Sequence, residues 1–297
     1  MGNGELFMKR LLTSLLLAGA VAGGATGISD EQTVPTGPYL GQTAPGDTPV
    51  AFAPGLVSSP HWDYGIGIGE GAKEFYFVTA GGMYEKATFL SYKQVGDQWQ
   101  KTVISKHVGQ PVIAPNGKMM HLGRRYKERT KDGWSEVKTL DLPFNDGYIM
   151  RMSSSNKGTL YFDSYVKDQP NFPIRYARKV GGKYQMPQAL SENINQGKNV
   201  NHPFVAPDES YIIWDAVREG GHGSSDIYIS FKQKDGTWGR AMSLGDKINT
   251  SAWEAAATVS PDGKYIFFNR NIGSDKYENV DIMWVSASII DELRTKQ

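Results

Sequence analysis

Short runs of apolar and aromatic residues, each preceded by a polar turn, recur along the chain. The clearest run is residues 265–268 (Y-I-F-F), which directly follow residues 260–264 (S-P-D-G-K). Proline, aspartate and glycine are typical of a tight turn, and aromatic and β-branched residues favour a strand. The pattern therefore predicts a tight turn that leads into a short, half-buried β-strand.

Weaker copies of this turn-strand unit occur upstream of the clearest one. Their turns lie at residues 70–73, 114–118, 155–158 and 206–210, and a run of strand-forming residues follows each turn. The copies are roughly 40–55 residues apart, which is the spacing of four-stranded propeller blades. We therefore predict an all-β fold, a β-propeller of about five four-stranded blades.

The first and last units of the repeat are incomplete in complementary ways. Residues 48–55 have the composition of an outer strand but follow no inner strands, whereas residues 254–286 supply inner strands without an outer one. Pairing the two would close the ring and remove exposed strand edges. We expect the strand near Val50 to pair beside residues 281–286. The apolar spacing in residues 288–294 predicts a short C-terminal helix outside the ring.

The beginning of the chain has the pattern of a secretory signal. Lys9 and Arg10 precede an apolar stretch at residues 11–21, which is too short to span a membrane comfortably, and small residues follow. We expect a signal peptide at 1–25, an extended linker at 26–47 that is rich in Gly, Pro and Thr, and one propeller domain at 48–297. The protein would then be periplasmic or secreted, with no membrane span after signal removal.

Composition limits the classes of function. The 297 residues include 32 Lys and Arg, 31 Asp and Glu, and no Cys. The nearly balanced charge gives no reason to expect a nucleic-acid partner, and the missing Cys excludes disulfides. The sequence contains no G-x-S-x-G elbow, no H-E-x-x-H motif and no EF-hand loop. We therefore expect no metal and no cofactor, and we favour binding over catalysis.

Several segments resemble a known family of propeller repeats. They are S-P-D-G-K-Y-I-F-F at 260–268, D-I-Y-I-S at 226–230, D-I-M-W-V-S-A-S-I-I-D-E-L at 281–293, and the exit W-x5-L-G-x2-I-N at 238–249. These segments resemble the WD40-like β-propeller repeats of TolB-type proteins, and the opening at 38–42 resembles small exported members. The resemblance covers residues 38–293. It implies an exported propeller, but the same scaffold hosts many activities.

The repeat also indicates where ligands would bind. In a propeller, the innermost strand of each blade starts on the face where the second strand ends, so these positions converge on the mouth of the central channel. The predicted ligand-binding residues are His61, Arg124, Arg151, Asp163, His202, Asp215, Arg218, Glu254 and Arg270. Such a ring suits an anionic or polyhydroxylated ligand, because guanidinium groups match carboxylates bidentately. The alternative is that these groups pair with one another or with water.

Three functions remain open from the sequence. The preferred one is an exported, soluble, non-catalytic propeller that binds a carbohydrate, a peptide or a partner protein at the channel mouth. The first alternative is a glycan-active enzyme: a glycoside hydrolase with carboxylates from Asp163, Asp215 and Glu254, or a polysaccharide lyase with His202 and Arg124 or Arg270. The second alternative is an envelope scaffold of the TolB type, by analogy of fold.

Overall fold

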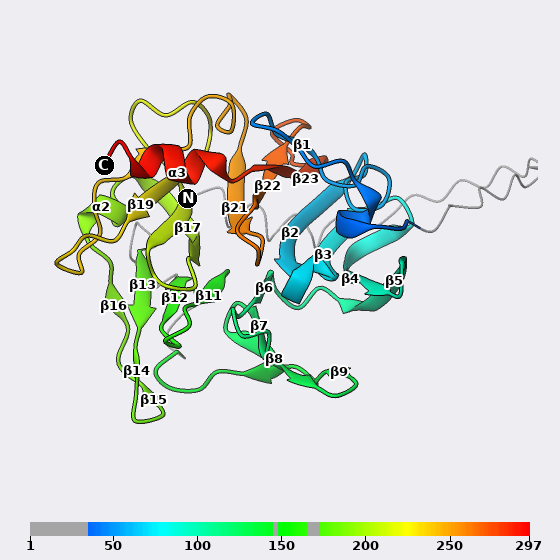
Figure 1. The fold of residues 1–297 in the computed structure, drawn as a ribbon, viewed down its shortest axis with the longest axis horizontal. Helices are drawn as coiled ribbons and strands as arrows, with labels where there is room; N and C mark the ends of the chain where they lie inside the picture. Colours follow the sequence, from blue (N-terminus) through cyan, green and yellow to red (C-terminus); the bar gives the residue numbers. More distant parts are fainter. Residues whose placement is uncertain (1–34, 145–147, 165–172) are drawn as a thin grey trace, which may run out of the picture. The chain divides into compact units, whose positions relative to one another are not determined.

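Five antiparallel blades are arranged around a central axis in this computed structural model, which describes residues 35–144, 148–164 and 173–297 (Figure 1). A parallel bridge between Trp62 and Val280 joins the first and last blades into one eight-stranded sheet. The predicted β-propeller with about five blades is therefore confirmed. The predicted signal peptide and the first part of the predicted linker lie outside the described residues. No helix among the described residues is long and apolar enough to cross a membrane.

The first three blades follow one another along the chain. The first comprises β2 (Trp62–Ile68), β3 (Glu74–Gly81), β4 (Tyr84–Val95) and β5 (Gln98–Lys106), with the 3-10 helix η2 (Glu70–Ala72) between β2 and β3. The second comprises β6 (Pro111–Ile113), β7 (Met119–Leu122), β8 (Arg125–Thr130), β9 (Gly133–Trp134) and β10 (Lys138–Thr139). The third comprises β11 (Met152–Ser154), β12 (Leu160–Asp163), β13 (Ile174–Ala177) and β16 (Gln188–Ala189), and the hairpin β14 (Lys179–Val180) and β15 (Lys183–Tyr184) extends from it.

The last two blades carry the strongest repeats. The fourth comprises β17 (Lys198–Val205), β18 (Tyr211–Val217), β19 (Asp226–Phe231) and β20 (Met242–Ser243), and α2 (Glu192–Asn195) leads into it. The fifth comprises β21 (Glu254–Val259), β22 (Tyr265–Asn271), β23 (Val280–Ser286) and β1 (Val50–Ala51). β18 and β22 each contain an apolar run whose side chains are buried.

A strand from the beginning of the described chain closes the ring. In the pairing of β1 with β23, Val50 lies opposite Trp284 and Ala51 lies opposite Met283. This is the predicted closure, and Figure 1 shows β1 beside β23. Because the fifth blade takes its outer strand from the other end of the chain, neither end can detach without exposing a strand edge.

An aromatic cluster holds this closure together. The ring of Phe52, directly after β1, lies 5.1 Å from Phe75, 5.0 Å from Phe267 and 5.2 Å from Trp284 between centroids. All four side chains are buried. Phe75 belongs to the first blade and the other two to the fifth, so Phe52 joins both sides of the seam.

The described end of the predicted linker packs against the propeller. The 3-10 helix η1 (Pro38–Gly41) buries Leu40, and the Tyr39 hydroxyl donates a hydrogen bond to Asp262 in the turn before β22. The indole N–H of Trp99 donates to the carbonyl of Gly37 at 2.7 Å. Residues 37–40 therefore contact both the first and the fifth blades rather than extending as a free arm.

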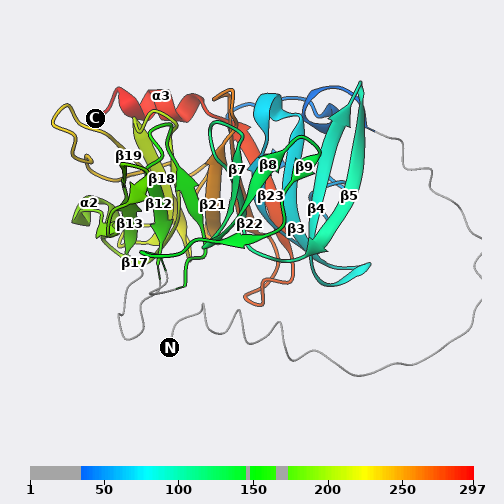
Figure 2. The same cartoon turned by 90° about the horizontal axis from the view of Figure 1, so that it is seen from below.

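The predicted C-terminal helix is present as α3 (Ser288–Arg294). It buries Ile290 and Leu293 in the apolar cluster that also contains Phe231 and Val285. Figure 2 shows α3 along one face of the propeller. β23 begins beside the channel mouth, where the backbone N–H of Val280 bonds to His61, and it ends at α3. The helix therefore lies on the face opposite the mouth.

A repeated hydrogen bond links successive blades near the mouth. Oδ2 of Asp163 accepts from the backbone N–H of His202 at 3.0 Å, and Oδ1 of Asp215 accepts from Ala256 at 2.9 Å. Oδ1 of Asn269 accepts from Gly65 at 3.0 Å. Each acceptor lies on the second strand of one blade, and each donor lies on the first strand of the next.

The three donors of these inter-blade bonds share an unusual backbone conformation. Gly65, His202 and Ala256 have φ of 60°, 52° and 56°, in the left-handed region. The strand register shifts beside each of them, as expected of β-bulges. The bulge turns the N–H toward the preceding blade, and the hydrogen bond offsets the strain, which is about 1 kcal/mol for a residue other than glycine.

Candidate binding site at the channel mouth

Four blades contribute polar side chains to a cluster at the centre of the ring. We call Tyr64, Gln110, Arg151, His202 and Asp215 the central cluster. Tyr64 comes from β2, Gln110 and Arg151 from positions at or just before β6 and β11, and the other two from the fourth blade. All five are buried. The fifth blade takes part through its backbone, because Nη2 of Arg151 donates to the carbonyl of Ala257 at 3.2 Å.

A chain of hydrogen bonds runs through the central cluster. Nε2 of Gln110 donates to the Tyr64 hydroxyl at 3.2 Å, and this hydroxyl lies 3.2 Å from Nε2 of His202. Nδ1 of His202 lies 2.9 and 3.1 Å from the two oxygens of Asp215. Because an ionised carboxylate only accepts, the network assigns a proton to Nδ1. In the neutral imidazole, Nε2 then accepts from Tyr64.

The electrostatic environment shifts the pKa values of two groups in this hydrogen-bond network. Burial alone would lower the pKa of His202, but the charge and hydrogen bond of Asp215 outweigh burial and raise it. Burial, together with the charge of Asp215, raises the pKa of Tyr64 well above its usual value. Tyr64 therefore remains a neutral phenol and cannot serve as a base near neutral pH.

Arg151 is fully buried and only partly satisfied. Its Nε and Nη1 atoms make no hydrogen bond to any described residue, and neither does Oε1 of Gln110 in the same cluster. Burial lowers the pKa of Arg151, because the charged form is poorly solvated. Buried donors and acceptors normally have partners. The cluster thus encloses both unpaired donors and an unpaired acceptor, and an ordered water molecule in the channel matches both.

Four other predicted residues hold backbone groups or one another, within a blade or at the connections between blades. Oδ1 of Asp163 accepts from the backbone N–H groups of Met150 and Arg151, in addition to the bond to the next blade. Oε1 of Glu254 lies 2.8 Å from Nε of Arg270. The two arginines hold connections between blades. Their acceptors are backbone carbonyls, of Asn193 and Ile194 for Arg218 and of Ile248 for Arg270.

His61 and Arg124 lie outside the central cluster. His61 is half-buried just before β2, and its imidazole lies against Gly82, where an added Cβ would be 2.7 Å from Nε2. Arg124 is half-buried between β7 and β8. The structure therefore brings together Arg151, His202 and Asp215 of the nine predicted residues, with Asp163 beside them. It spreads the others around the ring.

Three aromatic rings form a stack beside the central cluster, and we call Trp62, Tyr64 and Trp253 the aromatic stack. The centroid of Tyr64 lies 5.1 Å from Trp62 at an interplanar angle of 10°, and 6.0 Å from Trp253 at 22°. Tyr64 is buried, whereas both tryptophans are partly exposed. Tyr277 contacts the Trp253 ring edge to face at 5.5 Å.

Trp62 and Trp253 differ from the other tryptophans in their surroundings. Of the seven tryptophans of the chain, Trp99, Trp214, Trp238 and Trp284 are buried. Trp134 is covered by the guanidinium of Arg129, which lies 3.9 Å from its ring. The remaining two belong to the aromatic stack. The sequence hypothesis missed Trp253. This residue lies just before the first strand of its blade, as His61 does in the first blade. The equivalence of the two positions could have indicated Trp253.

The site contains no recognisable metal centre. In the part of the chain that the structure describes, no group of three or more His, Cys, Asp or Glu side chains is placed to hold a metal ion. The carboxylates of Asp163, Asp215 and Glu254 accept hydrogen bonds from protein groups instead.

No protein-family model and no curated protein sequence matches the chain. Among solved structures, a gluconolactonase from Xanthomonas campestris is similar over 85% of this chain and 97% of its own, with 12% identity and a TM-score of 0.48. TolB from Acinetobacter baumannii is similar over 76% and 57%, with 13% identity and a TM-score of 0.46. Kuenenia stuttgartiensis hydrazine synthase is similar over 69% and 61%, with 14% identity and a TM-score of 0.42.

The chain spans about three fifths of the length of the TolB and hydrazine synthase chains. At these identities and TM-scores, the likenesses carry no argument about function. The propeller rests on the strand order of the chain itself.

Proposed function

We propose that this protein is an exported propeller that binds a carbohydrate at the channel mouth, with a sugar ring packed on the aromatic stack. The observation that carries the proposal is the pair of partly exposed tryptophans, Trp62 and Trp253, on either side of Tyr64. The C–H groups on one face of a pyranose are apolar and weakly positive, and an aromatic face is apolar and weakly negative. The two faces therefore match.

The central cluster supports a hydroxyl-bearing ligand over an anion. The cluster and its surroundings combine two basic side chains, Arg151 and His202, with two acidic ones, Asp163 and Asp215, so positive charge is not concentrated there for an anion. Its unpaired groups are the donors of Arg151 and the acceptor of Gln110. Because these atoms are buried, ordered water would link them to a sugar hydroxyl, and both water and hydroxyl donate and accept. A neutral, hydroxyl-bearing ligand therefore fits the mouth better than the carboxylate ligand expected from the ring of arginines.

Glycoside hydrolysis remains a second candidate because of Asp281. The parallel bridge between Trp62 and Val280 places Asp63 and Asp281 side by side, next to the aromatic stack. Burial and the charge of Asp63 raise the pKa of Asp281 to about 6, in the range of a general acid. Turnover of chromogenic glycosides that is lost in Asp281→Asn would favour this candidate over binding alone.

Export and an envelope role are part of the proposal. The basic residues Lys9 and Arg10 and the apolar stretch that follows support a secretory signal. A periplasmic or secreted location and a TolB-type scaffold role with an envelope partner both follow from this pattern and from the resemblance of the repeats. Fractionation of cells that express the full chain, with amino-terminal sequencing of the exported form, tests the location. Cytoplasmic protein with an uncut start would contradict it.

The binding proposal is tested by a glycan array followed by calorimetry with the best ligand. Trp253→Ala and Trp62→Ala should each weaken binding by about tenfold or more, which corresponds to about 1.4 kcal/mol. Trp134→Ala is the matched control, because Trp134 is also partly exposed but lies outside the stack. Binding that survives both stack variants, or no binding to any glycan on the array, would overturn the proposal.

A further inference from the structure

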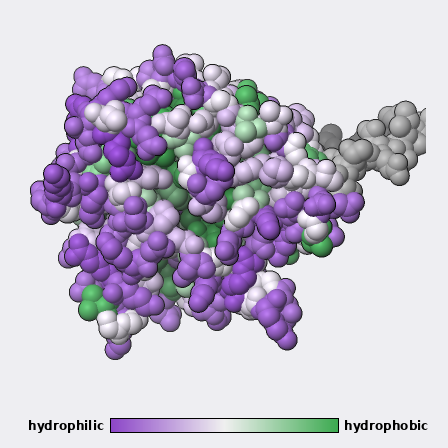
Figure 3. Space-filling view, in the orientation of Figure 1, coloured by the Kyte–Doolittle hydropathy of each residue, from purple (hydrophilic) through white to green (hydrophobic). Residues whose placement is uncertain are grey.

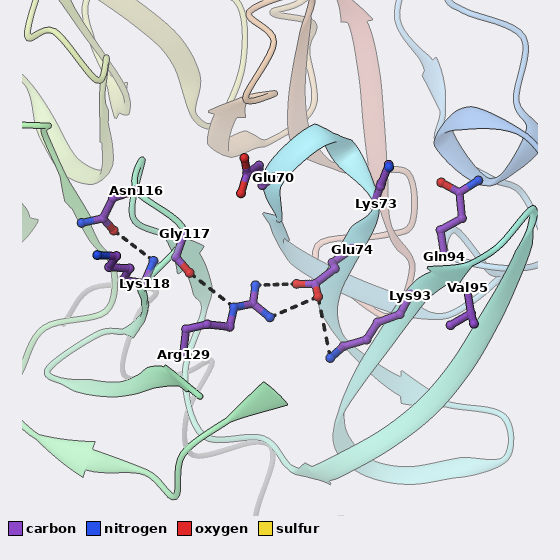
Figure 4. A pocket seen from close by; sticks show the side chains of 10 residues that line it. All are labelled: Glu70, Lys73, Glu74, Lys93, Gln94, Val95, Asn116, Gly117, Lys118 and Arg129. Atoms are coloured by element: carbon purple, nitrogen blue, oxygen red, sulfur yellow. Dashed lines mark hydrogen bonds and ion pairs between the residues drawn. The ribbon is translucent and has the colours of Figure 1, made fainter. Parts of the chain in front are cut away.

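A pocket of about 490 Å³ lies between the first and second blades, away from the mouth (Figure 4). Its walls come from η2, the start of β3 and the end of β4 in the first blade, from the turn between β6 and β7, and from Arg129 on β8. In each blade, the first strand ends and the second strand begins on the side of the ring opposite to the mouth. These elements lie on that side. The pocket is therefore separate from the aromatic stack and the central cluster.

One wall of the pocket is a fixed ion-pair network around Glu74. Its two carboxylate oxygens accept from Nη1 and Nη2 of Arg129 at 3.1 and 2.6 Å, and Lys93 lies 3.7 Å away. Tyr76 also donates to this carboxylate at 2.9 Å. Burial alone would raise the pKa of Glu74, but Arg129 and these neighbours outweigh burial and lower it. The charge of Glu74 is thus compensated before any ligand arrives.

The guanidinium of Arg129 is held flat as well as paired. It lies 3.9 Å from the ring of Trp134, and the indole N–H of Trp134 donates to the Tyr76 hydroxyl at 2.8 Å. Figure 4 shows Arg129 and Lys93 both pointing toward Glu74. A cation clamped between a carboxylate and an aromatic face loses little freedom on binding. This wall is therefore organised in advance.

The other charges that line the pocket are mostly positive. The lining includes Lys73, Lys93, Lys118 and Arg129, against Glu70 and Glu74. Lys73 and Lys118 are exposed and make no ion pair with a described residue. Glu74 is already compensated by Arg129 and Lys93, so Glu70 is the remaining acidic side chain of the lining and the basic side chains outnumber the acidic ones.

The pocket borders a basic sector of an otherwise neutral chain. Residues 84–138, which form the outer first blade and most of the second, contain eleven Lys and Arg but five Asp and Glu. The whole chain has 32 and 31, so positive charge is concentrated in this sector. Figure 3 shows a surface that is mostly hydrophilic on the face seen in Figure 1. A concave site within one sign of charge concentrates oppositely charged ligands.

We propose that this pocket binds an anionic group, a phosphate, sulfate or carboxylate, between Lys73 and Lys118 and against the wall formed by Arg129 and Lys93. The lysines supply charge without fixed geometry, which suits a group that projects from a larger molecule. The site would act independently of carbohydrate binding at the mouth. Because the two sites lie on opposite faces, a single ligand could occupy both only if it extended around the outer edge of the propeller.

The test uses the full-length exported protein and isothermal titration with inorganic phosphate, sulfate and glucuronate at low salt. We expect saturable binding of at least one of these probes, in the millimolar range or tighter, and weakening as salt rises. The three arms distinguish a phosphate, a sulfate and a carboxylate source. No saturable binding of any probe would overturn the proposal.

Variants separate this pocket from general charge effects. Lys73→Gln combined with Lys118→Gln should weaken binding at least fivefold, whereas Lys234→Gln combined with Lys276→Gln, which removes the same charge from exposed positions elsewhere, should not. Both double variants should bind glycan at the mouth like the wild type, which distinguishes failure here from failure of the proposed function. Equal weakening by the two double variants would also overturn the proposal.

Discussion

The carboxylate of Asp215 holds the imidazole of His202 and, through the same Oδ1, the backbone N–H of Ala256 in the next blade. Both contacts are 2.9 Å long. A single side chain therefore orients the central cluster and joins the fourth blade to the fifth. The site and the assembly of the ring depend on the same buried charge.

Replacement of Asp215 by Asn removes the negative charge but keeps a side chain of nearly the same shape. Because the amide can still accept from Ala256, we expect the free energy of unfolding to fall by only about 1–3 kcal/mol. The pKa of His202 should fall, because Asp215 is the main group that raises it. Side-chain NMR of the imidazole across pH and chemical denaturation measure both quantities.

The pH dependence of stability follows from the same pair. Since folding raises the pKa of His202, its contribution to stability is present below about pH 6.5, the unfolded value, and is lost as the pH rises through the folded value. Asp215→Asn should abolish this loss, and Asp246→Asn, at an exposed position, should leave it unchanged. An unchanged His202 titration in Asp215→Asn would contradict the account.

Asp281 should destabilise the closed ring at neutral pH. Burial and the neighbouring Asp63 raise its pKa to about 6, so the folded state holds a proton between pH 4 and 6 that the unfolded state has released. Stability should therefore fall as the pH rises through this window. Asp281→Asn should gain about 1–2 kcal/mol at pH 7 and nothing near pH 4. Denaturation at both pH values, with Asp275→Asn as an exposed control, checks the sign.

Phe52 should be the most sensitive position of the closing segment. Its ring is fully buried against the first and fifth blades, so Phe52→Ala should cost about 3–5 kcal/mol. Val50 lies two residues earlier, in β1, but its side chain is 46% exposed. Val50→Thr should therefore change stability by less than about 0.5 kcal/mol. Comparable effects of the two changes in urea denaturation would show that the seam is not closed by this segment.

Asn269 should matter to stability through one amide group. It accepts from Gly65 and its Nδ2 donates to the carbonyl of Asp63 at 3.1 Å, both across the seam between the fifth and first blades. Asn269→Ala leaves these buried backbone groups unpaired, at a cost of about 1–3 kcal/mol. Asn271→Ala, two residues on, removes only exposed hydrogen bonds and is the control. Hydrogen exchange at the Gly65 amide should rise in the first variant alone.

Much of the fold could be predicted because its signals are local. The turn before β22 and its copies each combine Pro or Gly with a strand-forming run, and a repeat of such units permits few folds. The closure by Val50 and Ala51 was also predictable. The last repeat unit lacked an outer strand, and the beginning of the chain offered an outer strand without inner ones. The packing of Tyr39 and Leu40 against the blades was not predicted, because polar and Gly-rich neighbours concealed two buried side chains.

The site was harder to predict because equivalent positions have different roles. Asp163 and Asn269 bond to backbone groups of their own and the neighbouring blade, whereas Asp215, at the equivalent position, also holds the imidazole of His202. Sequence gives the register of a side chain but not the partner it chooses among backbone and charged groups. Arg270 was placed at the mouth by register, yet its guanidinium binds Glu254 and a carbonyl.

The most direct test of carbohydrate binding at the mouth is fluorine NMR of the protein labelled with 5-fluorotryptophan, titrated with the best glycan from the array. Signals are assigned with the single Trp→Phe variants. The account predicts that the resonances of Trp62 and Trp253 shift and saturate together, while those of the buried Trp99, Trp214 and Trp284 stay in place. Saturating shifts confined to other tryptophans, or unchanged resonances of both Trp62 and Trp253 at saturating glycan, would contradict it.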